Sequence, residues 1–435
     1  DVDLSELATL LQTDSSLVSG QQSLWRYFEF KYIPVELISR LYEEFLGENK
    51  KDKGLYYTPS HLAKLLVDES LPLKNYNDYD LDTFRVLDPA CGSGIFLVSA
   101  FKRLVQIWRL QHAMHAPTLS DLKGLILKVY GVDKEEQAVR LASFSLCLAL
   151  CNELNPIDII NKLKFDDLRE GNLIHSDFFQ CEQLEKESFD LVIGNPPFKF
   201  GGISDYSPNW IYEKEKVKIP QGQIAIKFLT DSLPYLKPSG LSCLIIKSSG
   251  LLYNSTSEKF RSFLFAKLDV VQILDFTALA RNKSLWDNGA DVATAAIFLR
   301  NRLPDTQKNI LHLTFRRTRG TKERIVFEID DYDLHFVDRP TAVNSKYVWK
   351  NNLLGGGRIK NVLDKFDGYT FKNYLEETEC IVGEGYKVGS KGKLSPNFIH
   401  NMKTLPTQYI REDGINLDGL EDMPEETIFE KIPPK

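Results

Sequence analysis

The sequence lacks three features that would each assign it to a class of protein. Its six cysteines form no C-x-x-C pair, so neither a cysteine zinc site nor a disulfide framework is indicated, and a reducing cytoplasm is expected. No apolar run approaches the ~20 residues that span a bilayer, and the N-terminus carries no secretory pattern, so no membrane partner is expected. The net charge of −6 shows no basic excess, so any nucleic-acid contact depends on local patches.

What the chain has is the length and composition of a globular protein. Its 435 residues allow two or three domains with a large core, and 43% of them are hydrophobic while 26% are charged. The chain begins with Asp1 rather than Met, and it ends soon after a new segment begins. We therefore expect it to be a piece of a longer protein.

A short apolar run ends at Asn195-Pro196-Pro197-Phe198. Residues 189–193 are predicted to form a buried strand, which the two prolines end because they cannot donate a ladder hydrogen bond. The loop that follows lies where open α/β sheets bind their ligands. An asparagine amide, backbone carbonyls and an aromatic ring suit a planar group that carries an exocyclic NH2. The alternative is a strand end punctuated by proline, without chemistry.

Two strands that come earlier in the sequence each end in an acidic residue. Residues 85–97 predict a strand ending at Asp88, then a turn in which Gly92 and Gly94 let the backbone approach a ligand, then a helix. A second strand ends at Asp133, the place where nucleotide-binding folds put the acid that bonds a ribose hydroxyl. The spacing between the two acids is longer than usual, and we attribute the excess to an inserted helical segment at 119–128.

Strands alternate with helices along most of the chain. Short strands are predicted near 171–175, 189–193, 240–247, 270–276 and 294–299, and helices at 60–71, 94–111, 135–153, 224–236 and 260–268. This alternation predicts an α/β fold with a doubly wound, mostly parallel, seven-stranded sheet. The expected divisions are a helical segment at 1–50, the α/β domain at 51–300, a basic extension with interleaved aromatics at 301–380, and a final segment at 381–435. The basic patches suit phosphate contacts, although each alone is more often a solvated surface.

The motifs gain their specificity from their order. They are Tyr-Tyr-Thr-Pro at 56–59, Asp-Pro-Ala-Cys-Gly-Ser-Gly at 88–94, Gly-Val-Asp at 131–133, Ser-Asp-Phe-Phe at 176–179 and Asn-Pro-Pro-Phe at 195–198. Over roughly 35–400 the chain resembles the gamma class of N6-adenine DNA methyltransferases. It resembles most the methylase regions of fused, type IIG-like restriction–modification enzymes and the type I modification subunits.

The resemblance implies an S-adenosylmethionine-dependent methyltransferase fold and methylation of a flipped adenine in a specific sequence of double-stranded DNA. It also implies that a specificity or nuclease subunit, or further fused domains, completes the system. Residues 381–435 then resemble the start of a DNA target-recognition domain.

The resemblance also assigns a role to each motif residue. The methionine part of the cofactor, its ribose and its adenine would be held by Tyr57, Thr58, Asp88, Ala90, Cys91, Gly92, Gly94, Asp133, Asp177 and Phe178, with Pro197 flanking the site. The Asn195 side-chain oxygen and the Pro196 carbonyl would accept the two N6 protons of the target base, and Phe198 would stack on it. The family often has Tyr at this last position, and Phe supplies the same ring face.

Several alternatives remain open. Cys91 suits packing better than nucleophilic attack, Asp177 can cap a turn, and Phe276 and Trp286 either line the base pocket or pack in the core. Rival functions are methylation of RNA or of protein glutamine, which also present a planar NH2. A further rival is a DNA-binding component of an anti-phage complex whose own catalysis is dispensable.

Overall fold

The computed structural model describes residues 58–164, 167–198, 217–280, 292–317 and 327–363, together with short stretches between 365 and 431. The expected helical segment at 1–50, Tyr57, Trp286 and most of 381–435 lie outside the described residues. The chain divides into two compact units, Asp1–Lys360 and Asn361–Lys435. Among the described helices, none combines the length and the apolar composition that crossing a membrane requires.

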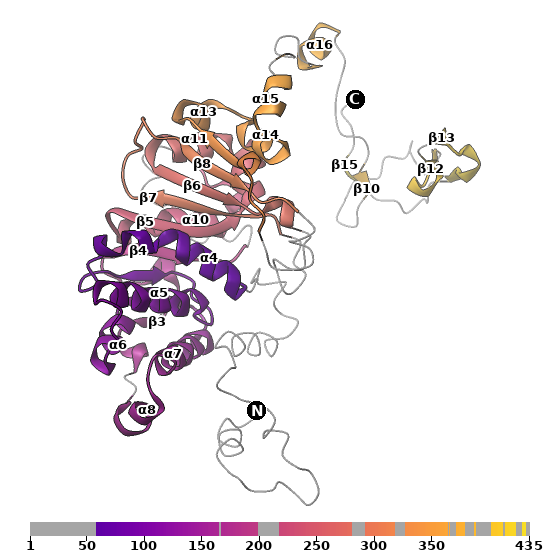
Figure 1. The fold of residues 1–435 in the computed structure, drawn as a ribbon. Coiled ribbons are helices and arrows are strands. Elements are labelled where there is room, and N and C mark those ends of the chain that lie inside the picture. Colours follow the sequence, from indigo (N-terminus) through magenta and orange to yellow (C-terminus); the bar gives the residue numbers. More distant parts are fainter. Residues whose placement is uncertain are drawn as a thin grey trace, which may run out of the picture. The chain divides into compact units, whose positions relative to one another are not determined.

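A nine-stranded sheet runs through the first unit in the order β3-β2-β1-β4-β5-β7-β6-β8-β9 (Figure 1). Strands β3, β2, β1, β4 and β5 are parallel neighbours, β7 is antiparallel to β5 and β6, and β9 is antiparallel to β8. The strands are β1 (Val86–Asp88), β2 (Val129–Asp133), β3 (Leu173–His175), β4 (Phe189–Gly194), β5 (Leu236–Lys247), β6 (Asp269–Asp275), β7 (Thr294–Arg300), β8 (Ile310–Thr314) and β9 (Leu334–Val337). The predicted α/β class with a mostly parallel sheet is confirmed, whereas the predicted count of seven strands is too low.

The two additional strands lie in the region that the sequence marks as a basic extension. β8 adds to β6 in parallel, and β9 adds to β8 in antiparallel orientation. β8 has only five residues, of which Ile310 and Leu313 are buried apolar positions, so its signal is weak beside the basic run that follows. The boundary expected at residue 300 therefore does not coincide with the end of the sheet.

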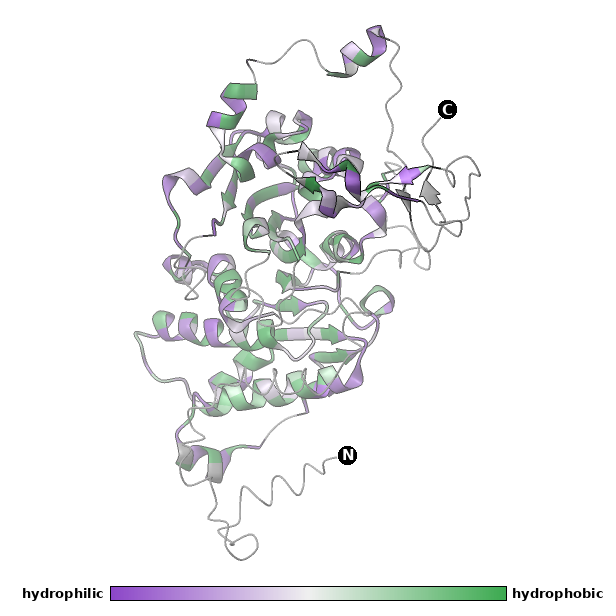
Figure 2. Cartoon of the chain, turned by 90° about the vertical axis from the view of Figure 1, so that its right-hand side faces the viewer, coloured by the Kyte–Doolittle hydropathy of each residue, from purple (hydrophilic) through white to green (hydrophobic). Residues whose placement is uncertain are grey.

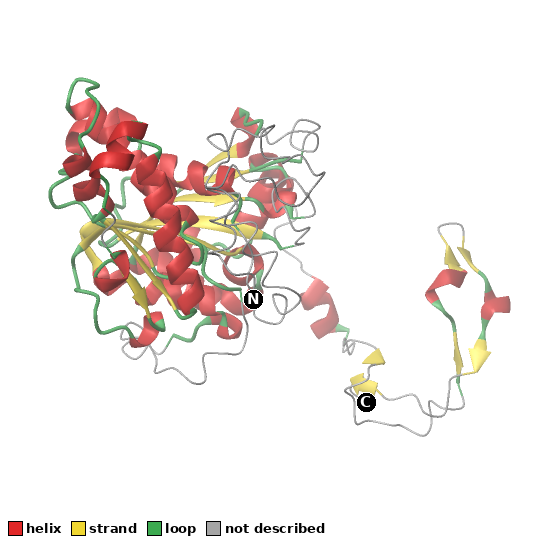
Figure 3. Ribbon diagram, turned by 90° about the horizontal axis from the view of Figure 1, so that it is seen from below, coloured by secondary structure: helices red, strands yellow, loops and turns green. Residues whose placement is uncertain are grey.

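Helices cover both faces of the sheet (Figure 3). α5 packs between α4 and α7 and lies on β1 and β2, while α10 packs on β5 and α11 on β6. The helices are α4 (Ser60–Ser70), α5 (Ile95–Gln111), α6 (Leu119–Ile126), α7 (Glu136–Cys151), α8 (Pro156–Lys162), α10 (Ile224–Asp231), α11 (Glu258–Lys267), α13 (Arg339–Asn344), α14 (Val348–Leu354), α15 (Gly357–Leu363) and α16 (Phe371–Glu377).

Amphipathic spacing explains why these segments pack as helices. In α4 the buried side chains recur at Leu62, Ala63, Leu66 and Val67, so one stripe of the helix faces the core while the other face is polar. Figure 2 shows the same division between hydrophobic and hydrophilic residues along the helices. Pro59 precedes α4 with an extended backbone, and no side chain caps the helix.

The described part of the second unit contains three small antiparallel pairs. Their strands are β10 (Lys387–Val388) with β15 (Phe429–Lys431), β11 (Lys403–Thr404) with β14 (Glu421–Asp422), and β12 (Ile410–Arg411) with β13 (Gly414–Ile415).

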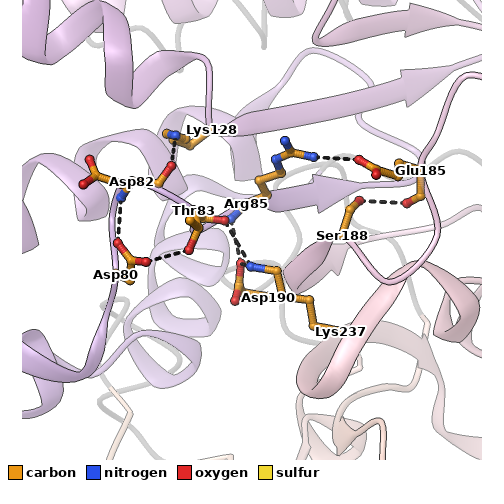
Figure 4. Close-up of polar contacts among 9 residues, drawn as sticks. All are labelled: Asp80, Asp82, Thr83, Arg85, Lys128, Glu185, Ser188, Asp190 and Lys237. Carbon is orange, nitrogen blue, oxygen red and sulfur yellow. Dashed lines mark hydrogen bonds and ion pairs between the residues drawn. The ribbon is translucent and has the colours of Figure 1, made fainter.

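A polar cluster fixes the amino-terminal edge of the parallel strands (Figure 4). The Lys237 ammonium lies 2.8 Å from the Asp190 carboxylate and donates to the Thr83 carbonyl at 3.1 Å. The Arg85 backbone N–H donates to the same carboxylate at 2.9 Å. These contacts join the starts of β1 and β4 to β5, at the edge of the sheet opposite to the motif residues.

A buried hydrogen-bond network attaches the added elements to the sheet. Asp275 ends β6, accepts from the Tyr253 hydroxyl, and lies 3.2 Å from Nε2 of His312 on β8. Nδ1 of His312 lies 3.2 Å from the Asn352 amide on α14. Asp275 and His312 are fully buried, so the hydrogen bonds compensate the cost of removing them from water.

Candidate active site

Three functional side chains reach the same edge of the sheet. Asp88 is the last residue of β1, Asp133 is the last residue of β2, and Asn195 directly follows the last residue of β4. β1 lies between β2 and β4, and all three strands are parallel, so their carboxyl ends meet at one place. This is the edge at which open α/β sheets bind ligands.

The glycine-rich turn after β1 is fastened to the end of β2. Gly92 and Gly94 have φ values of 51° and 85°, a backbone conformation that favours glycine. The Gly92 N–H donates to Oδ2 of Asp133 at 2.9 Å, and the Glu135 N–H donates to Oδ1 of Asp133 at 2.9 Å. A single carboxylate therefore holds both the turn and the start of the segment leading to α7.

The two acids at the strand ends lie in an environment that disfavours negative charge. Burial raises the pKa of Asp88 to about 8, with the nearby Asp133 adding to the shift and the Ala90 N–H, which donates at 3.0 Å, opposing it. Burial also raises the pKa of Asp133, against the backbone N–H groups of Glu135 and Gly92. Buried carboxyl groups of this kind favour a ligand that brings a cation or hydroxyl donors. The residues present therefore fit a cofactor that carries an amino group and a ribose.

Cys91 serves packing in this turn. It is buried, and burial, followed by the charges of Asp133 and Asp88, raises the pKa of its thiol well above the usual range. A nucleophilic thiolate is therefore strongly disfavoured. The sulfur lies so near β2 that a Cβ on Gly131 would approach Sγ to 2.9 Å. This agrees with the packing interpretation made from the sequence.

The Asp177-Phe178 motif follows β3, and both residues have structural partners. Oδ1 of Asp177 accepts from the Phe179 N–H at 3.0 Å, so Asp177 caps the short 3-10 helix Phe178–Gln180. Phe178 is buried and stacks on Phe228 of α10, with ring centroids 5.4 Å apart. Lys227 of the same helix lies over Phe179 at 4.2 Å. Sequence reasoning missed Lys227 and Phe228, because no local pattern links α10 to a motif about fifty residues earlier.

In the Asn195–Phe198 loop, the asparagine is half-buried while Pro196 and Phe198 are buried. Nδ2 of Asn195 donates to Oγ1 of Thr58 at 2.9 Å, which joins two motifs that are 137 residues apart. The exposed fraction of Phe198 is 8%.

Phe276 belongs to the core. It is fully buried and stacks on Phe315, with ring centroids 4.7 Å apart. Of the two interpretations that the sequence left open for Phe276, the packing one describes its position.

The sheet is doubly wound, its first two strands end in an acid, and Asn-Pro-Pro-Phe follows its fourth strand. This combination defines a class of cofactor-dependent enzymes. Residues 35–334, more than half of the chain, match the N-6 DNA Methylase family. The chain belongs to this family.

Two relatives illustrate the similarity. The methylase subunit of the type I restriction enzyme MjaIX from Methanocaldococcus jannaschii is 23% identical over 396 residues, which cover 82% of this chain and 62% of that protein. The type II restriction enzyme and methyltransferase RM.Eco57I from Escherichia coli is 24% identical over 346 residues, or 65% of this chain and 34% of that protein. The chain thus spans less than two thirds of either relative.

Similarity to solved structures extends to the fold. A cryo-EM structure of a DrdV–DNA complex matches 72% of this chain and 33% of its own, with a TM-score of 0.51 and 16% sequence identity. At this identity the match supports the architecture of the sheet and its helices.

Proposed function

We propose that the protein transfers a methyl group from S-adenosylmethionine to the N6 amino group of a flipped adenine in DNA. The observation that carries the proposal is the position of Asn195-Pro196 at the carboxyl end of β4. There the loop lies beside the strand that ends in the buried Asp88, in a chain of the N-6 DNA methylase family.

The cofactor would be held along the ends of β1, β2 and β3. The amino-acid end would be wrapped by Asp88, Ala90, Cys91, Gly92 and Gly94, together with Tyr57. Asp133 would bind the ribose hydroxyls, while Asp177 and Phe178 would receive the adenine beside Pro197. S-adenosylmethionine supplies an electrophilic methyl group on a sulfonium.

The loop after β4 would make the target nitrogen reactive. An adenine N6 lone pair is delocalised into the ring and is a poor nucleophile. Oδ1 of Asn195 and the carbonyl of Pro196 would accept hydrogen bonds from its two N–H groups, which would draw the nitrogen toward a tetrahedral geometry and concentrate electron density for in-line attack. The same oxygens would stabilise the positive charge that develops on the nitrogen as the sulfur–methyl bond breaks, and the excess N6 proton would then pass to water, so no strong base is needed. The rest of catalysis is positioning.

The base must leave the duplex to reach this loop, at a cost of a few kcal/mol. Stacking on Phe198 can return ~1–3 kcal/mol. Since only 8% of Phe198 is exposed, its ring face has to be uncovered before the base can stack on it.

We propose double-stranded DNA as the substrate and a restriction–modification or other anti-phage system in the cytoplasm as the setting. Of the two relatives described above, one is a subunit of a restriction enzyme and the other is a restriction enzyme and methyltransferase, and this chain spans only part of each. Target recognition would then be completed by a specificity or nuclease subunit or by further fused domains. The basic, aromatic residues of 301–380 are candidates for contacts to the DNA backbone.

The test is methylation of unmodified DNA by the full-length protein, followed by sequencing that detects modified adenines. We expect N6-methyladenine at one recurring sequence, and Asn195→Ala should nearly abolish it. Methylation of RNA or of protein glutamine in place of DNA would support the rival substrates. A wild-type rate of DNA methylation by Asn195→Ala would contradict the proposed catalytic site.

A further inference from the structure

The hydroxyl of Thr58 is hydrogen-bonded to the side chain on which the proposed reaction depends. Oγ1 of Thr58 lies 2.9 Å from Nδ2 of Asn195, and Thr58 is 6% exposed. The bond joins the segment before α4 to the loop after β4. It is therefore a tertiary contact between two motifs that the sequence treats separately.

An asparagine amide has two different ends of nearly equal size. One end is an acceptor oxygen and the other is an NH2 donor, and the terminal torsion is broad and roughly two-fold. Only the orientation that places the oxygen toward the target can receive an N6 proton. The flipped orientation would place two N–H groups against the NH2 of adenine, which also donates.

The Thr58 hydroxyl can bond either end of the amide, because it has one O–H donor and acceptor lone pairs, so the direction of its bond to Asn195 fixes the orientation. In the structure this oxygen receives a hydrogen from Nδ2, so Nδ2 faces Thr58 and Oδ1 occupies the other branch of the amide. A hydroxyl bonded to Oδ1 instead would favour the unproductive orientation. The direction of this single hydrogen bond thus decides which end of the amide meets the substrate.

The position of Thr58 is itself well supported. The next residue, Pro59, precedes α4 with an extended backbone, and its carbonyl accepts from the N–H groups of Leu62 and Ala63 at 3.0 Å. The buried stripe of α4 packs against α5 and β5, so the hydroxyl is presented from a fixed element. A rigid support of this kind is what holds a functional group in one geometry.

We propose that Thr58 is a positioning residue that orients the Asn195 amide for methyl transfer. This inference rests on the proposed function and deepens it, since Thr58 would act on the target side of the site through Asn195. The role differs from the cofactor contact that the family resemblance implies for Thr58, and the two roles predict different measurements.

The test compares Thr58→Val, Thr58→Ala and Thr58→Ser in the full-length protein. Single-turnover methylation of unmodified DNA is measured at saturating S-adenosylmethionine, and the dissociation constant of S-adenosylmethionine is measured by calorimetry. We expect Thr58→Val and Thr58→Ala to lower the saturating rate about tenfold, the effect of losing one ordinary hydrogen bond. Their cofactor affinity should stay within about twofold, and Thr58→Ser should restore the rate to within about twofold, because the hydroxyl returns.

Three outcomes would overturn the inference. The first is a wild-type rate for both Thr58→Val and Thr58→Ala, and the second is a weakened cofactor affinity with an unchanged saturating rate. The third is a loss of rate that Thr58→Ser does not reverse, which would mean that packing by the threonine methyl group is responsible.

Asn195→Ala serves as the reference. If it is inactive while the Thr58 variants keep the wild-type rate, the inference fails and the proposed function stands. If Asn195→Ala keeps its activity, the proposed function fails as well.

Discussion

Gly194 and Asp88 approach so closely that a Cβ on Gly194 would lie 2.5 Å from Oδ1 of Asp88. Gly194 ends β4, and Asp88 ends the neighbouring β1. The missing side chain lets a buried carboxyl group lie directly beside the residue that precedes Asn195. This contact brings the proposed cofactor side of the site and the proposed target side together.

We expect Gly194→Ala to lower both stability and cofactor affinity. The added methyl group must displace the Asp88 carboxyl, which is buried and bonded to the Ala90 N–H, so overpacking should reduce the free energy of unfolding by ~1–3 kcal/mol. Urea unfolding and calorimetric titration with S-adenosylmethionine measure the two effects. Gly124→Ala is the matched control, because a Cβ on Gly124 meets nothing within 4 Å. Equal stability of the two variants would contradict the steric argument.

Cofactor affinity should rise with pH between about 6 and 7.5. The pKa of Asp88 is raised to about 8, so in this range the group must release a proton before it can pair with a cationic amino group. The affinity should increase by up to about tenfold per pH unit, with proton release visible as a dependence of the binding enthalpy on the buffer. Asp88→Asn should bind more weakly and without this rise. The titration of the cofactor's own amino group is common to both proteins.

The raised pKa of Asp88 also predicts how the stability of the cofactor-free protein depends on pH. The folded pKa of Asp88 lies above its ordinary value of 3.8, so its protonated form stabilises the fold at low pH. That contribution decreases as the pH rises from about 4 through about 8. The difference in unfolding free energy between the native protein and Asp88→Asn should follow this trend, and a difference independent of pH would exclude it.

Phe198→Ala should slow methylation without abolishing it. Loss of base stacking costs ~1–3 kcal/mol, whereas loss of the Asn195 acceptor removes the interaction that activates the nitrogen. Phe198→Tyr keeps the ring face and should remain within several-fold of the native rate. With 2-aminopurine at the target position, fluorescence should show less stable extrusion for Phe198→Ala than for Phe198→Tyr. Identical signals would argue against stacking on this ring.

Tyr253→Phe should destabilise the fold through the buried Asp275 network. Burial raises the pKa of Tyr253, so its hydroxyl stays protonated and donates to Asp275. Removing this donor leaves a buried acceptor less satisfied and should reduce the free energy of unfolding by ~1–3 kcal/mol. Tyr332→Phe removes an exposed hydroxyl and should change stability by no more than ~0.5 kcal/mol. Similar values for both variants in urea unfolding would show that the network contributes little.

Much of the fold follows from local patterns. The helix predicted at 94–111 is observed at Ile95–Gln111, and the strand predicted at 294–299 is observed at Thr294–Arg300. These elements have strong periodicity and clear end signals. β8 and β9 have neither signal, since they contain only five and four residues. They gain their stability from pairing with β6 and with each other, which a local pattern does not show. The sheet therefore continues beyond the expected boundary.

The sequence by itself determined the order of the motifs and the residue types of the candidate site, because glycine turns, strand-ending acids and Asn-Pro-Pro-Phe are local signals. Only the tertiary structure decided which of these groups touch. The contact between Gly194 and Asp88 and the hydrogen bond from Asn195 to Thr58 both join residues more than a hundred positions apart. Such contacts depend on strand order and helix packing, which no local pattern encodes. The direction in which the Asn195 amide points is accordingly a property of the folded chain.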